Sequence, residues 1–158
     1  MNLEQHLQIL AIHRETLKYL TSLVNQEEAQ SFHEKPEAWT ILEVMCHLRD
    51  FEVIFVERVE QMLKKITPTF TAYDQDELVR ENNYSEQRLS EVVQAFGLYR
   101  ERTIAIFKGL EPQQWGRMGL HPTQGRLTVA DMPERMIFHD SKHIRQITRI
   151  LASKKSSV

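Results

Sequence analysis

Three histidines are the residues of this chain whose type and spacing could do chemistry. His139 and His143 stand one helical turn apart in the segment FHDSKHIRQI, and His47 lies far from them in EVMCHLRD. An α-helix turns once in about 3.6 residues, so the first two imidazoles project from one face and can bind the same metal ion. Three neutral imidazoles around zinc or a similar divalent ion leave a fourth position for water or substrate. The spacing therefore suggests an open metal site that could act as a catalyst.

The same histidines also allow an interpretation without metal. A pair of histidines on one helix face can lie at the surface or at the edge of the core and bond to backbone or acidic groups. His47 lies among apolar residues, where a hydrogen-bonded histidine at the core edge is common. Glu43, one turn before His47, could bond the ring nitrogen that faces away from a metal, or act as a base, but it also has the position of a helix-capping residue. The residues alone leave these alternatives open and assign no catalytic residue.

The elements that must position these histidines are predicted to be helices. Four long segments carry apolar residues at spacings of three and four, whereas few segments show the alternation typical of strands. Four long helices within one small domain predict an all-α four-helix bundle. The expected helices cover residues 2–25, 40–65, 85–109 and a last segment that begins at Thr128 or Asp131 and ends near 152.

Capping residues indicate where these helices begin. Thr40 and Glu43 have the spacing of a capping box, in which each residue's side chain bonds the backbone N–H of the other. Ser85 is a suitable N-cap for the third helix. Asp131 and Glu134 form a second capping signature before the apolar face of the last helix.

The connections differ in length and composition. A long polar connection, Thr67 to Tyr84, joins the second and third helices and could contain a short helical turn. The prolines and glycines from Pro112 to Gly125 predict a structured loop before the last helix. We expect a single domain, residues 1–152, followed by a flexible tail, residues 153–158.

Composition and charge argue against nucleic-acid binding, membrane insertion and secretion. The 158 residues are 41% hydrophobic and 27% charged, with a net charge of -2, so electrostatics favours neither nucleic acid nor an anionic membrane as a partner. The start, MNLEQHLQIL, is unlike a secretory signal, and no apolar stretch approaches the ~18 residues of a membrane span. A single cysteine cannot form an internal disulfide, which agrees with a reducing compartment. We therefore expect a cytoplasmic location.

Polar residues near the histidines have ordinary interpretations. Asp50 and Asp140 adjoin the histidines and are expected to face solvent. Cys46 lies about 100° around the helix from His47, so we expect a small core residue and not a nucleophile. His121 is expected to fix the conformation of its loop and is left out of the ligand set.

Together these residues resemble the DinB-like (DinB/YfiT) family of metal-binding four-helix proteins. The similarity rests on Trp39, Glu43 and His47 in WTILEVMCHLRD, on the loop WGRMGLHPTQGRLT, and on the histidine pair in HDSKHIRQI, in the family's order over almost the whole chain. The resemblance implies that His47, His139 and His143 bind one divalent metal ion, with zinc or nickel ahead of iron or manganese. It also implies a homodimer and no contact with DNA.

The resemblance implies two kinds of metal-dependent enzyme that act on a small-molecule substrate. Some relatives are thiol-S-transferases that use a low-molecular-weight thiol, bacillithiol or mycothiol, and others are regarded as hydrolases. The alternative is a non-catalytic, stress-associated bundle in which the ion fixes the helices. Four arginines could recognise a carboxylate on such a thiol, although arginines on helices are usually solvated or paired. They are Arg49, Arg126, Arg135 and Arg145.

Overall fold

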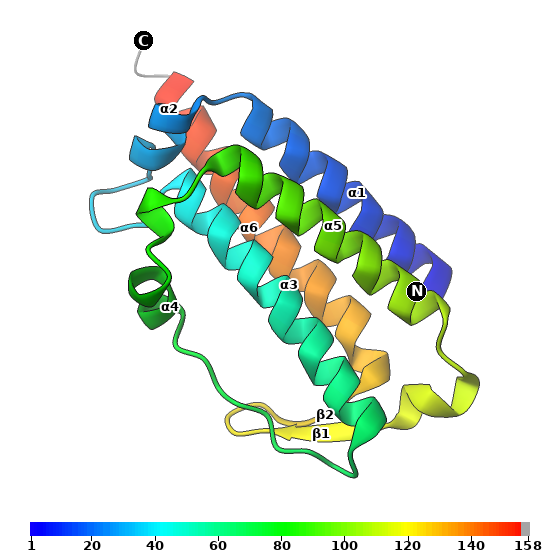
Figure 1. Ribbon diagram of the computed structural model, residues 1–158. Coiled ribbons are helices and arrows are strands. Elements are labelled where there is room, and N and C mark those ends of the chain that lie inside the picture. Colours follow the sequence, from blue (N-terminus) through cyan, green and yellow to red (C-terminus); the bar gives the residue numbers. More distant parts are fainter. Residues whose placement is uncertain (156–158) are drawn as a thin grey trace.

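Four long helices pack side by side in the computed structural model, which describes residues 1–155 (Figure 1). Their apolar faces meet in two clusters of buried side chains, one toward each end of the bundle. The predicted all-α four-helix bundle is confirmed. The four helices are α1 (Leu3–Ser22), α3 (Ile41–Lys64), α5 (Leu89–Lys108) and α6 (Met132–Lys155).

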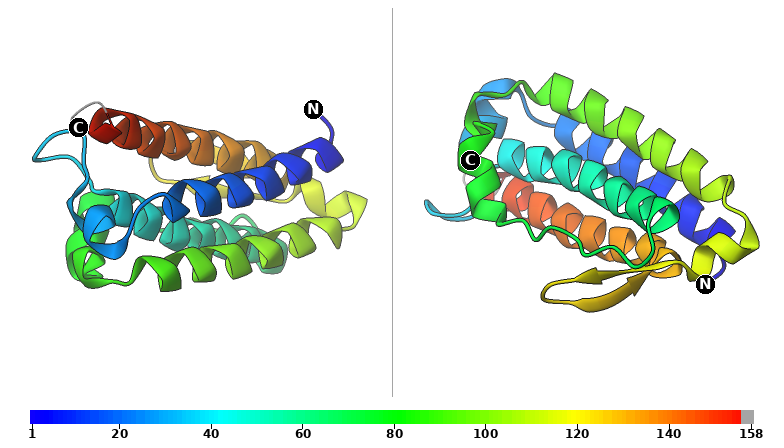
Figure 2. Two further views of the ribbon diagram at one scale, coloured as in Figure 1. Left: turned by 90° about the horizontal axis from the view of Figure 1, so that it is seen from above. Right: turned by 60° about the horizontal axis from the view of Figure 1, so that its bottom comes forward.

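The direction of the helices explains the long connection between α3 and α5. Helices α1 and α6 run one way and α3 and α5 the other, as Figure 1 and the left view of Figure 2 show. Neighbouring helices α3 and α5 are thus parallel, and residues 65–88 must return along the length of α3, roughly 36 Å. This return carries α4 (Gln75–Glu81) and a 3-10 turn (Tyr84–Glu86), in agreement with the predicted helical turn.

Among the first three long helices, one predicted end and one predicted start are wrong. The first helix ends at Ser22, because Asn25 caps a separate short helix, α2 (Gln26–Ser31). Ser85 is not the N-cap of α5, since it lies in the 3-10 turn, and Arg88 has the cap position without a side-chain bond. Instead, the Leu89 N–H donates to Oε1 of Gln26 at 2.8 Å. A contact between distant segments therefore replaces the local cap that the sequence suggested.

The capping box before α3 is confirmed. The Thr40 N–H donates to Glu43 Oε2 at 2.8 Å, and the Glu43 N–H donates to Thr40 Oγ1 at 3.2 Å. Before α6, the carboxylate of Asp131 accepts from the Thr128 N–H at 2.8 Å, and a 3-10 turn follows. Helix α6 continues to Lys155, three residues into the segment predicted as a tail, and residues 156–158 lie outside the described part.

The structured loop before α6 contains a β-hairpin, which was not predicted. Strands β1 (Met118–His121) and β2 (Gly125–Thr128) pair antiparallel. Nδ1 of His121 accepts hydrogen bonds from the N–H groups of Thr123 and Gln124, so this histidine fixes the turn as expected. Gly125 follows with a φ of 74°, a conformation that favours glycine. Each strand is only four residues long, too short for its alternation to be recognised in the sequence.

The hairpin is held against the return segment after α3. The Phe70 N–H donates to the Leu120 carbonyl and the Leu120 N–H to the Pro68 carbonyl, both at 2.8 Å. The ring of Phe70 lies directly against Gly119, where a Cβ atom would collide with it. Hairpin and return segment therefore lie together beside α3 and α6 (Figure 2, right).

A buried ionic network lies between the two apolar clusters. The Arg100 side chain is fully buried and donates to Glu52 at 2.9 and 2.8 Å, to Asp140 at 2.8 and 3.1 Å, and to the Leu10 carbonyl at 3.0 Å. Although burial alone would lower the pKa of Arg100, the two carboxylates raise it, so the guanidinium stays charged. The network joins all four long helices.

No helix in residues 1–155 combines the length and apolar character that a membrane crossing requires.

Replacing Gly119 by Ala should destabilise the protein by about 1–3 kcal/mol, because the new Cβ meets the buried ring of Phe70. The free energy of unfolding in urea measures this loss. Gly116→Ala is the matched control, since its Cβ would have no atom within 4 Å and should change stability by less than about 0.5 kcal/mol. Equal losses in both variants would contradict the steric argument.

Replacing Arg100 by Met should cost about 3–5 kcal/mol of stability, because Glu52 and Asp140 would remain buried without their cation. Arg102→Met tests the specificity of this effect. Arg102 is 65% exposed and bonds only Glu60, so its loss should cost no more than about 1 kcal/mol. Chemical denaturation at neutral pH compares the two variants, and a small effect of Arg100→Met would show that the network is dispensable.

Candidate metal centre

The three histidines singled out in the sequence come together between α3 and α6. His47 lies in the second turn of α3, and His139 and His143 lie one turn apart on α6. One ring nitrogen from each is within 4.8 Å of the others. His47 and His143 are buried, and His139 is partly exposed. Helices that pack side by side thus bring together residues separated by about ninety positions in the sequence.

The orientation of the rings leaves nitrogens free to bind an ion. The Nε2 atoms of His47 and His139 are 2.9 Å apart, which fits either an N–H···N bond or two ligands of one ion. Zinc–nitrogen bonds of roughly 2.0–2.1 Å in tetrahedral geometry place two nitrogens about 3.3 Å apart, only a few tenths of an ångström more. His143 Nε2 is buried and has no hydrogen-bond partner in the described residues. The donor set therefore fits a divalent metal.

The group that orients His143 is Gln146. His143 Nδ1 lies 2.8 Å from Oε1 of Gln146, one turn further along α6, so the protonated Nδ1 can donate and leave Nε2 as the free acceptor. The glutamine stands three residues after the histidine, a spacing that could have indicated this role.

Glu43 does not make the hydrogen bond to His47 that the sequence suggested. His47 Nδ1 is buried without a partner among the described residues, and Glu43 instead bonds the backbone of Thr40. Its capping role is thus the one that the geometry supports.

Burial keeps the three imidazoles neutral. It lowers the pKa of His47 to about 2, with His139 and His143 adding to the effect, and it lowers the pKa of His139 to about 3. The pKa of His143 is lowered for the same reason. A neutral imidazole is the form that binds metal ions, so the site is ready for a cation at neutral pH.

Aromatic rings surround the imidazoles. The Trp39 ring centroid is 4.9 Å from that of His47, and Phe51 is 4.4 Å from His47 and 5.3 Å from His139. Trp39 therefore forms a wall of the site. Such rings limit the access of water to the imidazoles.

A pocket of about 830 Å³ reaches the site at His139. Phe51 and Phe55 line it from α3, and the hairpin contributes Leu127. The volume lies in the range of sites for small organic ligands, about 300–1,000 Å³. The arrangement can therefore hold an ion beside space for a substrate.

Two acidic neighbours of the histidines were expected to face solvent, but Asp140 is buried and Asp50 is only partly exposed. Asp140 is 2% exposed and bonds Arg100 and His13. Asp50 accepts from the Tyr84 hydroxyl at 2.6 Å and from Arg49 at 2.9 Å. Arg49 is the neighbour of Asp50 on α3, whereas Tyr84, Arg100 and His13 come from the return segment or from other helices and could not be identified from the local sequence.

Cys46 lies in the core, as expected. Its side chain is fully buried, and burial raises the pKa of the thiol to about 12. This thiol is therefore neither a metal ligand nor a nucleophile at neutral pH.

A model of the DinB superfamily matches residues 8–147. The chain belongs to this superfamily. The resemblance seen in the sequence is thereby confirmed. A relative from Oceanobacillus iheyensis, OB0413, whose name proposes a metal-dependent hydrolase, is 21% identical over 138 residues, which are 87% of this chain and 78% of the relative.

Solved structures share the fold. YfiT from Bacillus subtilis, described as a probable metal-dependent hydrolase with an unusual four-helix bundle topology, superimposes with a TM-score of 0.89 at 21% identity, covering 98% of this chain and 90% of YfiT. The mycothiol-dependent maleylpyruvate isomerase gives 0.77 at 13% identity, covering 93% of this chain and 61% of the isomerase. ClbS, a colibactin self-resistance protein solved with double-stranded DNA, gives 0.67 at 12%, covering 96% and 95%. At these identities the likeness establishes the fold and not a shared activity.

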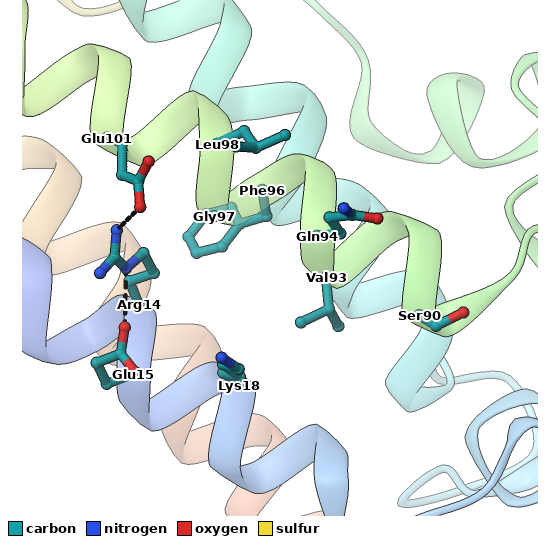
Figure 3. A pocket seen from close by; sticks show the side chains of 10 residues that line it. All are labelled: Arg14, Glu15, Lys18, Ser90, Val93, Gln94, Phe96, Gly97, Leu98 and Glu101. Atoms are coloured by element: carbon teal, nitrogen blue, oxygen red, sulfur yellow. Dashed lines mark hydrogen bonds and ion pairs between the residues drawn. The ribbon is translucent and has the colours of Figure 1, made fainter.

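A second hollow, of about 340 Å³, lies between α1 and α5 (Figure 3). Its arginine, Arg14, bonds Glu101 at 2.6 Å and Glu15 at 2.9 Å. The residues that line it include no histidine or cysteine. It therefore lacks the imidazole ligands of the other pocket, and its arginine is already paired with carboxylates.

The metal-depleted protein should lose stability as the pH falls from about 6.5 toward 3. His47 and His139 stay neutral in the fold, whereas in the unfolded chain they bind protons below a pKa of about 6.5. These two histidines therefore do not change the free energy of unfolding above about pH 6.5. Below that pH, each lowers it by up to about 1.4 kcal/mol per pH unit. Urea denaturation between pH 7 and 4.5 measures the slope.

His139→Gln should make this slope shallower, because glutamine does not titrate. The same slope in the variant and the wild type, or constant stability down to pH 5, would contradict the neutral burial of these imidazoles.

Proposed function

We propose that this protein is a metal-dependent enzyme in which His47, His139 and His143 hold one divalent ion and a small-molecule substrate enters the adjoining pocket. The observation that carries the proposal is the convergence of three neutral imidazoles within 4.8 Å at a pocket of about 830 Å³. Zinc or nickel is the first expectation for the ion, since both suit imidazole ligands.

An open coordination position supports an enzyme over a purely structural ion. Within residues 1–155, the ligand cluster contains no fourth histidine, cysteine or carboxylate. Structural zinc sites usually have four protein ligands, whereas catalytic sites have three and leave one position for water or substrate. A non-catalytic bundle protein remains the alternative if no reaction accompanies metal binding.

The surrounding residues have distinct tasks in this proposal. Gln146 holds the His143 ring so that Nε2 faces the ion, and Phe51 and Trp39 restrict water. An ion in this position supplies Lewis-acid chemistry, because it can activate water or keep a thiol deprotonated. The buried thiol of Cys46 is unsuited as a nucleophile, and the nucleophile in this proposal is water or a thiol that enters from solution.

These two nucleophiles correspond to two reactions, and we place hydrolysis first. The names of OB0413 and YfiT support it, because both refer to metal-dependent hydrolases. Thiol transfer comes second, supported by the shared fold of the mycothiol-dependent isomerase. The expected homodimer and the absence of nucleic-acid binding are secondary parts of the proposal, and the DNA complex of ClbS makes the latter worth testing.

His47→Ala and His139→Ala should each remove the metal and leave the bundle folded. Elemental mass spectrometry of untagged protein purified without chelator should find nearly one divalent ion per wild-type chain and almost none in either variant. Circular dichroism should remain helical, because the two apolar clusters hold the helices together. His6→Ala, on α1 and outside the ligand cluster, is the control and should keep the metal.

Activity assays on the metal-loaded protein then separate the reactions. Hydrolysis of small chromogenic esters or amides without added thiol would support the first reaction, and conjugation of a low-molecular-weight thiol to a chromogenic electrophile the second. A wild-type protein that stays empty after incubation with zinc, nickel and manganese would refute the metal site. Bound metal with neither reaction would favour the non-catalytic alternative.

A further inference from the structure

We propose that the pocket beside the three histidines binds a small organic carboxylate, and that Arg58 is the residue that recognises it. The inference deepens the proposed function, on which it rests only in treating this carboxylate as part of the substrate. The binding itself requires no metal.

Within residues 1–155, Arg58 is a buried cation without a carboxylate partner. The residue is 6% exposed, lies on α3 and lines the pocket. Its Nε is buried and has no hydrogen-bond acceptor in the described part of the chain. The guanidinium makes one long hydrogen bond, 3.3 Å, to the Thr71 carbonyl, and lies 5.7 Å from the Phe70 ring centroid. A buried charge is normally paired, so this side chain lacks an anion.

The rest of the pocket does not supply that anion. Arg126, Arg135 and Lys142 also line it, and none of the four cations forms an ion pair within 4 Å in residues 1–155. The pocket lining also includes two carboxylates, fewer than the four cations. Asp131 is bonded to Thr128 and also interacts electrostatically with Arg135 and Arg126, and Glu134 is exposed. The pocket therefore has an excess of positive charge.

The electrostatic surroundings of Arg58 agree with this excess. Burial lowers the pKa of Arg58, Tyr73 opposes this change and Arg135 adds to it. Burial, Arg58 and Arg135 also lower the pKa of His121 in the hairpin. Like charges thus lie close together, and an anion between them would relieve their repulsion.

The position of Arg58 suits a ligand that also reaches the histidines. Eleven residues separate it from His47, close to three full turns, so both residues lie on the same stripe of α3, about 16 Å apart along the axis. Phe51 and Phe55 lie between them on this stripe and line the pocket. Arg135 stands one turn before His139 on α6. An elongated molecule can therefore place a carboxylate at the arginines and its reacting group near the histidines.

Carboxylate is the anion that matches this site. The planar guanidinium presents parallel N–H groups that match the two oxygens of a carboxylate. Arg14 in the other hollow shows the contrast, because its charge is already balanced by Glu101 and Glu15. Arg58 differs from Arg14 in that it is buried and has no carboxylate partner in residues 1–155.

Isothermal titration calorimetry of succinate binding to metal-depleted protein tests this inference without interference from the metal. The metal is removed by dialysis against a resin-bound chelator. Succinate should bind wild type, and Arg58→Gln should weaken binding at least tenfold. Arg58→Lys, which keeps the charge but loses the planar fork, should give an intermediate effect. Arg149→Gln, which changes an exposed arginine bonded to Glu34, should bind as wild type does.

A melting curve of each variant accompanies the titration. If Arg58→Gln does not fold, Arg135→Gln replaces it and should weaken succinate binding as well. No binding of succinate to wild type, unchanged binding in the folded arginine variant, or preference for inorganic phosphate over succinate would each overturn the proposal. Metal content is measured on the same wild-type preparation before depletion. Succinate binding by a protein that takes up no metal would refute the proposed function alone, and metal uptake without succinate binding would refute this inference alone.

Discussion

The buried guanidinium of Arg100 is the interaction on which the arrangement of the four long helices depends. It extends from α5 and bonds Glu52 of α3, Asp140 of α6 and the Leu10 carbonyl of α1. Apolar contacts tolerate small rotations of a helix, because they have no preferred direction. A buried charge does not tolerate them, since losing one partner leaves an uncompensated ion in the core. The apolar clusters stabilise the bundle, and this network selects one way of packing it.

The position of the candidate metal centre follows from that selection. Asp140 points from α6 toward Arg100, and His139 precedes it by one residue, about 100° around the helix. His143, three residues after Asp140, lies on the same side as His139. The rotation of α6 that satisfies Arg100 therefore turns both histidines toward His47 on α3. A site made of three side chains from two helices needs such a constraint, because small displacements separate its ligand atoms.

Residue spacing along a single helix was sufficient to predict features that depend only on residues close in sequence. The Thr40–Glu43 capping box and the shared face of His139 and His143 depend only on helical geometry. Features that depend on distant partners were not predictable in this way. The sequence could not show that Asp140 meets Arg100, or that Gln26 of α2 would replace Ser85 as the cap of α5. Likewise, the hairpin is too short to have a recognisable period and depends on backbone bonds to the return segment.

The two buried arginines of the bundle, Arg100 and Arg58, have different roles: one stabilises the fold and the other is available to bind a ligand. Arg100 meets two carboxylates, so its charge is balanced by the fold, and no room remains for another anion. Arg58 is nearly as buried but has no carboxylate within the described residues, so the fold tolerates an unbalanced charge beside the pocket. One long hydrogen bond and an aromatic ring compensate such a charge only in part, so its burial costs free energy of desolvation. A ligand that brings its own anion recovers this cost, and the same residue that weakens the empty protein then contributes to affinity and selectivity.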